Sequence, residues 1–99
     1  MPIWELEPVD PTVDHWRRNT WVAAVFVRAN NELVAREVAQ SAFGIAAEKP
    51  PSAEAPSMPW VNEWISTCER VEDSEYDEEG SDDILGPEEA LVRVYSRPG

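Results

Sequence analysis

The residues best suited to chemistry in this 99-residue chain are concentrated in one short run. Residues 69–83, ERVEDSEYDEEGSDD, hold nine of the twenty acidic side chains and a single base, Arg70. The run therefore carries a charge of −8, out of −12 for the whole chain. Acids spread evenly along a chain favour solubility, whereas a concentrated anionic stripe is typical of a surface that meets a cation. The positive charge would come either from a metal ion or from a basic surface of another protein.

Calcium is the first metal to test against so many carboxylates. Glu75, Asp77 and Glu79, followed by Gly80, place acids at positions one, three and five and glycine at six of an EF-hand loop. The match then fails, because position twelve needs a bidentate Glu and is Gly86. We predict no dedicated metal site and no cofactor. A calcium-responsive module remains a third alternative, which predicts that calcium raises the melting temperature and magnesium does not.

Catalysis has few candidate residues. Cys68 and His15 are the only cysteine and histidine, and nothing in the sequence brings them together as nucleophile and base. One Cys and one His do not supply the usual four zinc ligands. A carboxylate pair needs one acid in an apolar pocket to raise its pKa, but these acids lie in a polar run. We therefore predict that the protein is not an enzyme.

The acidic run has two serious interpretations. It is either a flexible solvated loop between two strands, or a set of carboxylates that mimics the phosphate spacing of a nucleic acid and fills a basic cleft. Tyr76 and the pair Ile84-Leu85 interrupt the acids as possible anchors, which favours the second interpretation, while Gly80-Ser81 favours mobility. The predicted partner-binding residues are Glu72, Asp73, Glu75, Tyr76, Asp77, Glu78, Glu79, Asp82 and Asp83.

The predicted partner is a basic, nucleic-acid-binding protein. Direct binding to nucleic acid or to anionic membranes is not expected, because both depend on Lys and Arg. The alternative is a small structural or assembly domain that docks, or forms a homodimer, through Trp60, Trp64 and the exposed edge of a terminal strand. The sequence leaves open whether these two tryptophans are core or surface. Charge-driven binding weakens with salt, and apolar docking hardly changes.

The first half of the chain contains clear elements that must position this run. Ile3–Glu7 alternates apolar and acidic residues and predicts a short strand, and residues 20–28, TWVAAVFVR, predict a central strand. Asn30 and Asn31 are N-cap types and Gly44 suits a helix end, so an amphipathic helix is expected between them. Its apolar positions are Val34, Ala35, Val38, Ala39, Ala42 and Phe43, with Arg36, Glu37 and Gln40 on the opposite side.

The second half of the chain contains weaker secondary-structure signals. Residues 49–59 contain four prolines and predict an extended connector. One helical turn is expected after Pro59, followed by a strand from about Ile65 to Glu72. After the acidic loop at 72–83, a single turn at 87–89 and a last strand at 91–96 complete the chain. The order β-β-α-β-β predicts a single α+β domain over residues 1–99, with a four-stranded, mostly antiparallel sheet and one main helix on a face.

The compartment follows from simple counts. The first ten residues have no basic region and no apolar stretch of the kind found in a secretory signal. The longest apolar run, residues 21–27, is far shorter than the ~20 residues of a membrane span. The single cysteine excludes an internal disulfide. We therefore expect a cytoplasmic protein.

In size and acidity, and in the run VFVRANNELVAREVAQSAFG, the chain resembles small acidic proteins of phages and prophages, including the anti-CRISPR proteins. The run covers about a fifth of the chain and is similar to a strand-then-helix unit of small bacterial proteins. The resemblance implies a small α+β inhibitor that presents carboxylates where phosphates would sit on nucleic-acid-binding machinery. It carries over no individual functional residue.

Overall fold

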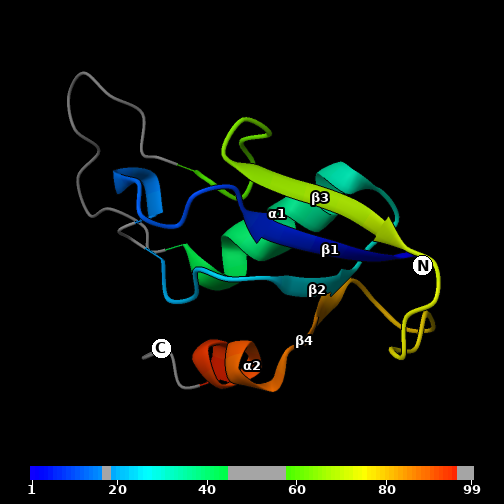
Figure 1. Ribbon diagram of the computed structural model, residues 1–99. Helices are drawn as coiled ribbons and strands as arrows, with labels where there is room; N and C mark the ends of the chain where they lie inside the picture. The colour runs from blue at the N-terminus through cyan, green and yellow to red at the C-terminus, as the bar shows by residue number, and fades with distance from the viewer. Residues whose placement is uncertain (17–18, 45–57, 96–99) are drawn as a thin grey trace.

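The structure is a computed structural model that describes residues 1–16, 19–44 and 58–95 (Figure 1). It confirms the predicted α+β class, with a four-stranded antiparallel sheet and one main helix. The elements are, in chain order, β1 (Ile3–Pro8), the short 3-10 helix η1 (Asp14–Trp16), β2 (Val25–Arg28), α1 (Glu32–Phe43), β3 (Ser66–Val71), β4 (Asp83–Gly86) and α2 (Glu88–Tyr95).

The strand order in the sheet is β3-β1-β2-β4, and every neighbouring pair is antiparallel. In the register, Leu6 of β1 lies opposite Val25 of β2 and Cys68 of β3. Successive side chains of a strand point to opposite faces. Leu6, Val25 and Cys68 therefore share one face, and Glu5, Phe26 and Glu69 share the other.

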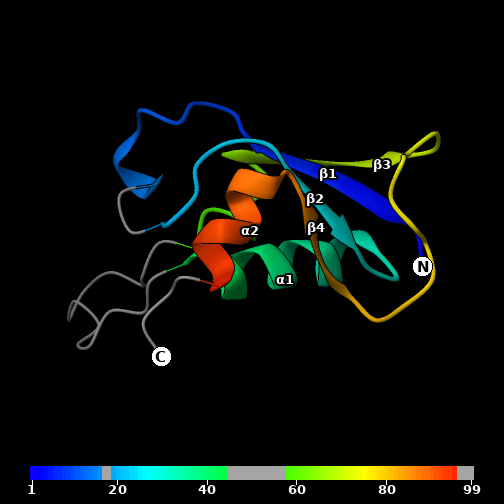
Figure 2. The ribbon, with the colours of Figure 1, turned by 90° about the horizontal axis from the view of Figure 1, so that it is seen from below.

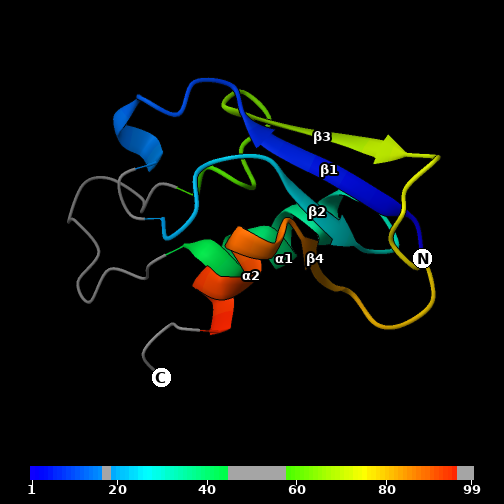
Figure 3. The ribbon, with the colours of Figure 1, turned by 60° about the horizontal axis from the view of Figure 1, so that its bottom comes forward.

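α1 covers only one face of the sheet. Figure 2 shows α1 on one side of β1, β2 and β3, and none of the described helices covers the other side. Figure 3 shows α2 beside α1 and past β4. α2 contacts both β4 and α1. The core between α1 and the sheet contains the buried residues Leu6, Val25, Val27, Ala35, Ala39, Phe43 and Ile84. We call the side without a helix the open face.

α1 begins and ends where the sequence predicts. The Asn31 side chain accepts a hydrogen bond from the backbone N–H of Val34 at 2.9 Å, which satisfies one of the free donors at the helix start. The backbone N–H of Gly44 donates to the carbonyl of Gln40 at the other end. One helical prediction was wrong: Arg36, expected on the polar side, is only 6% exposed.

Hydrogen bonds explain the burial of Arg36. Its guanidinium donates to Glu32 Oε2 at 2.9 Å, to Ser66 Oγ at 2.8 Å, and to the carbonyls of Trp60 and Ser66 at 3.3 Å. A buried charge is tolerated when it is paired and its donors are satisfied. Arg36 thus ties α1 to β3 and to the segment before it.

The second strand is shorter than predicted. The sequence suggested residues 20–28, but β2 begins at Val25. The backbone N–H of Thr20 instead donates to the carbonyl of Phe43, and Asn19 forms an isolated bridge with Gly44. The indole N–H of Trp21 donates to the carbonyl of Ala24. The first two contacts bind residues 19–20 to the end of α1, and the third is local to residues 21–24.

The predicted last strand at 91–96 was wrong, because residues 88–95 form α2. The fourth strand is β4, at the end of the acidic run. Ala90 is buried and Leu91 and Val94 are half-buried, whereas Val92 and Arg93 are exposed. That spacing is helical rather than alternating. Pro87 precedes the helix, and Glu88 and Glu89 occupy its first turn, where acids are favourable.

The remaining segment predictions have mixed outcomes. β1 and β3 agree with the predicted strands to within one or two residues. After Pro59 the chain forms successive turns with i→i+3 hydrogen bonds, from Val61 to Met58 and from Asn62 to Pro59. Residues 49–57 of the predicted connector lie outside the described residues. In the described part of the chain, no helix has the length and apolar character needed to cross a lipid bilayer.

Candidate acidic interface

The acidic loop, residues 72–82, connects β3 to β4 at one end of the sheet (Figure 1). All eight predicted acids are exposed, and Tyr76 is half-buried. Asp83, predicted as the last loop residue, is the first residue of β4. The structure thus places the predicted residues together along one connection, and the carboxylates of Glu72, Asp73, Glu75, Asp77, Glu78, Glu79, Asp82 and Asp83 are all accessible there.

Arg28, at the end of β2, holds the backbone of this loop. Its Nε donates to the carbonyl of Ser81 at 2.7 Å, and its Nη1 donates to the carbonyl of Asp77 at 2.9 Å. Gly80 permits this approach, because its φ is +123° and a Cβ there would lie 2.8 Å from Arg28 Cζ. The arginine binds backbone carbonyls, so its contacts fix the loop without using the carboxylates.

Tyr76 is the second anchor of the loop. Its ring packs on Phe26 of β2, with centroids 5.3 Å apart and planes tilted by 39°. Gly86 leaves room for the ring, because a Cβ at that position would lie 2.9 Å from Tyr76 Cζ. Burial raises the pKa of the Tyr76 hydroxyl, and the charge of Glu75 raises it further. The tyrosine is therefore neutral at physiological pH and attaches the loop to the open face.

Within the part of the chain that the structure describes, no carboxylate of the loop forms an ion pair, and the two cations at the loop, Arg28 and the Met1 amino group, bind its backbone carbonyls. Among the described residues, the one ion pair joins Arg36 to Glu32, outside the loop. Within the loop, Asp77 Oδ1 accepts from the backbone N–H of Glu79 at 2.8 Å. At its end, Asp83 Oδ1 accepts from the N–H of Ile84, also at 2.8 Å. These bonds stabilise the local turns and leave the negative charge on the surface.

The open face adds acids that the sequence-based site did not include. Glu5 and Glu7 of β1 and Glu69 of β3 lie on it, and Glu7 and Glu69 are exposed. The register puts Glu5 directly opposite Glu69, and like charges in that position destabilise a sheet. The alternation of apolar and acidic residues in Ile3–Glu7 indicates that Glu5 and Glu7 point to the same face of the sheet. The pairing with Glu69 required the register.

The two tryptophans of the alternative docking site have opposite environments. Trp60 is fully buried, donates its indole N–H to Asn19 Oδ1 at 3.1 Å, and stacks edge-on against Trp16 with centroids 4.8 Å apart. Trp64 is 83% exposed. Trp60 is therefore a core residue, and the predicted patch of both side chains does not form. Trp64 and the free edge of β3 remain as the alternative surface.

The described residues offer little for nucleophilic or metal chemistry. Burial raises the pKa of the Cys68 thiol to about 12, an effect that outweighs the opposing influence of the Arg36 charge. Cys68 is therefore protonated at neutral pH, and a thiol is a much weaker nucleophile than a thiolate. Within residues 1–16, 19–44 and 58–95, no three His, Cys, Asp or Glu side chains are grouped in a way that would hold a metal ion.

The chain matches no protein-family model, no curated protein and no solved structure. Its function therefore has to be inferred from its own residues. The acidic interface, defined as the acidic loop, Asp83, and Glu5, Glu7 and Glu69 of the open face, is the surface on which that inference rests.

Proposed function

We propose that this chain is a non-enzymatic, cytoplasmic binding protein that presents the carboxylates of its acidic interface to a basic surface of a nucleic-acid-binding protein. It would act as an inhibitor by occupying the site of the phosphates, in the manner of the anti-CRISPR proteins that it resembles in size and acidity. A nuclease or a CRISPR effector is the kind of partner expected.

One observation carries this proposal: the loop is held by its backbone, while none of the described cations forms an ion pair with its carboxylates. Arg28 binds two backbone carbonyls of the loop, and the Met1 amino group donates to a third, that of Glu78, at 2.9 Å. Holding the loop before binding reduces the conformational entropy lost on association. Unpaired carboxylates also accelerate encounters with a basic partner through long-range attraction.

The position of Glu5 directly opposite Glu69 in the sheet supports the same proposal. Glu5 is half-buried and Glu69 is exposed, and strand positions on a face without a helix tolerate many polar residues, so a pair of opposed carboxylates is not needed for folding. A basic partner would convert this unfavourable pair into a favourable contact, since each carboxylate would gain a cation. The loss of stability in the free protein is then offset in the complex.

The test is a pull-down from nuclease-treated bacterial lysate with the immobilised chain, read by mass spectrometry. The loop variant replaces Glu72, Asp73, Glu75 and Glu78 by Gln or Asn. The matched control removes the same number of charges from exposed positions outside the interface, Asp14, Glu63, Glu88 and Glu89. We expect the wild type and the control to capture nucleic-acid-binding proteins, and the loop variant to lose them. Added double-stranded DNA should release them.

Salt gives a second readout of the same experiment. Charge-driven capture should fall steeply between about 0.05 and 0.5 M NaCl. Equal capture by the loop variant and the wild type would overturn the proposal. Circular dichroism should show the loop variant folded and slightly more stable, because neutralisation relieves repulsion.

A second candidate function is favoured by Trp64. An 83% exposed tryptophan just before the free edge of β3 suits an assembly domain, because tryptophan is enriched among residues that dominate binding energy. Capture that resists salt and is lost in Trp64→Ser would support this candidate. Sedimentation velocity would show whether the captured molecule is a second copy of the chain.

A further inference from the structure

We infer that an open groove between α1, β4 and α2 binds an apolar segment of the partner that is flanked by lysine or arginine. This inference rests on the proposed function and specifies the partner's chemistry. The groove has a volume of about 380 Å³, which is in the lower part of the range for binding pockets. It adjoins the acidic interface, because Asp82 and Asp83 line it.

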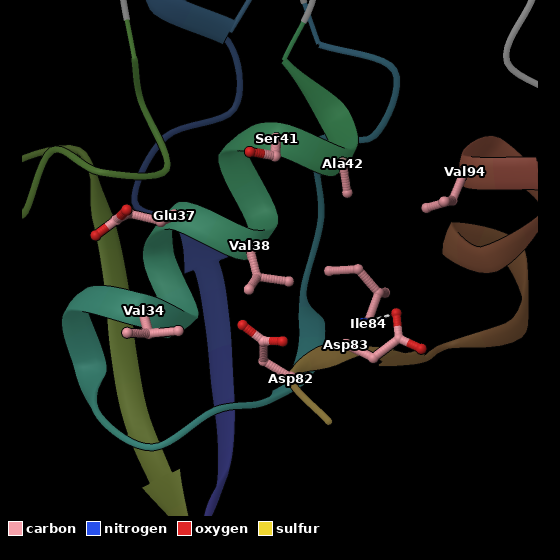
Figure 4. A pocket seen from close by; sticks show the side chains of 9 residues that line it. All are labelled: Val34, Glu37, Val38, Ser41, Ala42, Asp82, Asp83, Ile84 and Val94. Carbon is pink, nitrogen blue, oxygen red and sulfur yellow. Dashed lines mark hydrogen bonds between the residues drawn. The ribbon is translucent and has the colours of Figure 1, made fainter. Parts of the chain in front are cut away.

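The floor of the groove is apolar. Figure 4 shows the side chains of Val38 and Ala42 from α1 facing those of Ile84 and Val94 from β4 and α2. Ile84 is buried, and the other three are half-buried. Apolar area that remains in water here gains free energy when a partner's apolar side chains cover it.

The rim of the groove is acidic. Asp82 and Asp83 lie at the start of β4, and Glu37 lies on α1 beside Val38 (Figure 4). All three carboxylates are exposed, and none of the described lining residues is basic. An apolar floor with this rim is complementary to a segment that combines apolar side chains with Lys or Arg.

Charge also selects this occupant over a second copy of the chain. Two copies would each bring a net charge of −12, so self-association at this rim would bring like charges together. A basic amphipathic segment gains from both the floor and the rim. The carboxylates of the acidic loop would steer it, and the groove would add affinity that salt does not screen.

The probe is a fluorescein-labelled peptide of leucine and lysine, about 14 residues long, with leucines at helical spacing. The reference peptide keeps the lysines and replaces each leucine by serine. Binding to the full chain is measured by fluorescence anisotropy. We expect both peptides to bind, because both carry cations, and the leucine peptide to bind more tightly and to retain more affinity at high salt.

Two groove variants and one control locate the binding site. Val94→Ser removes an apolar floor contact, and Ala42→Met fills the groove. Val92→Ser is the control, since Val92 is 58% exposed on the same helix and does not line the groove. We expect both groove variants to weaken the leucine peptide at least about fivefold and to leave the serine peptide unchanged. Val92→Ser should change the affinity of neither peptide.

Circular dichroism and a melting curve establish that each variant is folded.

The outcomes separate this inference from the proposed function. If neither peptide binds the wild type, the proposed function fails and this inference fails with it. If both bind the wild type and the folded groove variants equally, only the groove inference is overturned. An equal loss in Val92→Ser would also overturn it. So would a wild-type dimer in sedimentation velocity that Ala42→Met converts to monomer, because the occupant would then be a second copy.

Discussion

The two faces of the sheet use an arginine in different ways. On the helix-covered face, the buried Arg36 is neutralised by Glu32 and bonded to Ser66 and Trp60. On the open face, Arg28 binds two backbone carbonyls of a loop that is full of carboxylates. Among the described residues, the buried charge of Arg36 is compensated by an ion pair, and the carboxylates of the acidic loop form none. This difference supports the proposal that the acidic side makes contact with a partner.

The substitution with the largest expected effect on stability is Arg36→Met, on the helix-covered face. Methionine keeps the apolar length of the side chain but removes the guanidinium donors from Ser66 and leaves Glu32 without its cation. We expect a loss of about 3 kcal/mol in the free energy of unfolding, measured in urea. Arg93→Met, at an exposed position of α2, should change it by less than about 0.5 kcal/mol. A small effect of Arg36→Met would mean that the compensated charge is dispensable.

Arg28→Met tests the other face with the same substitution. It removes two charge-assisted bonds at a more exposed site, so we expect a loss of about 1.5 kcal/mol. Amide hydrogen exchange in residues 77–82 should accelerate more than exchange in α1. Arg70→Met, in the same acidic run, is the control, because Arg70 is exposed on β3. Unchanged exchange in the loop would show that Arg28 does not hold it.

Cys68 lies on the helix-covered face, and its reactivity measures how well that face excludes water. Since burial raises its pKa to about 12, its reaction with a disulfide reagent at pH 8 should be at least about tenfold slower in the folded protein than in urea. A raised folded pKa also means that the contribution of this group to stability is present below pH 9 and is lost as the pH rises toward 12. Equal reaction rates would contradict the burial of the thiol.

The smallest expected effect on stability comes from a substitution on the open face. Glu5→Gln removes one charge of the opposed pair with Glu69 and should stabilise the fold by about 0.5 kcal/mol. Glu7→Gln is the matched control, because Glu7 lies opposite Thr67. The gain should shrink at about 0.5 M NaCl, where exposed charges are screened. If Glu5→Gln destabilises the fold, the pair is not repulsive in the free protein.

The acidic residues of the candidate site were readable from the sequence, but their arrangement was not. Glu72 to Asp83 are local in the chain, so their concentration needed no structure. The contacts that hold the loop do need it, because Arg28 and Phe26 are about 50 residues away and their approach depends on the order and register of the strands. The groove combines α1, β4 and α2, and no local pattern marks it.

The sequence alone determined those helices and strands whose capping residues or apolar spacing lie within a few neighbouring positions. The cap at Asn31 and the apolar period of α1, together with the alternation in β1, specify their own conformation. Tertiary structure decided the rest. Residues 91–95 suit either a strand or a helix, and the burial of Ala90 together with the packing of the half-buried Val94 against the core favours the helix. Trp60 and Trp64 are the same residue type four positions apart, and tertiary packing against Trp16 and Phe43 buries the first, whereas the second stays in water.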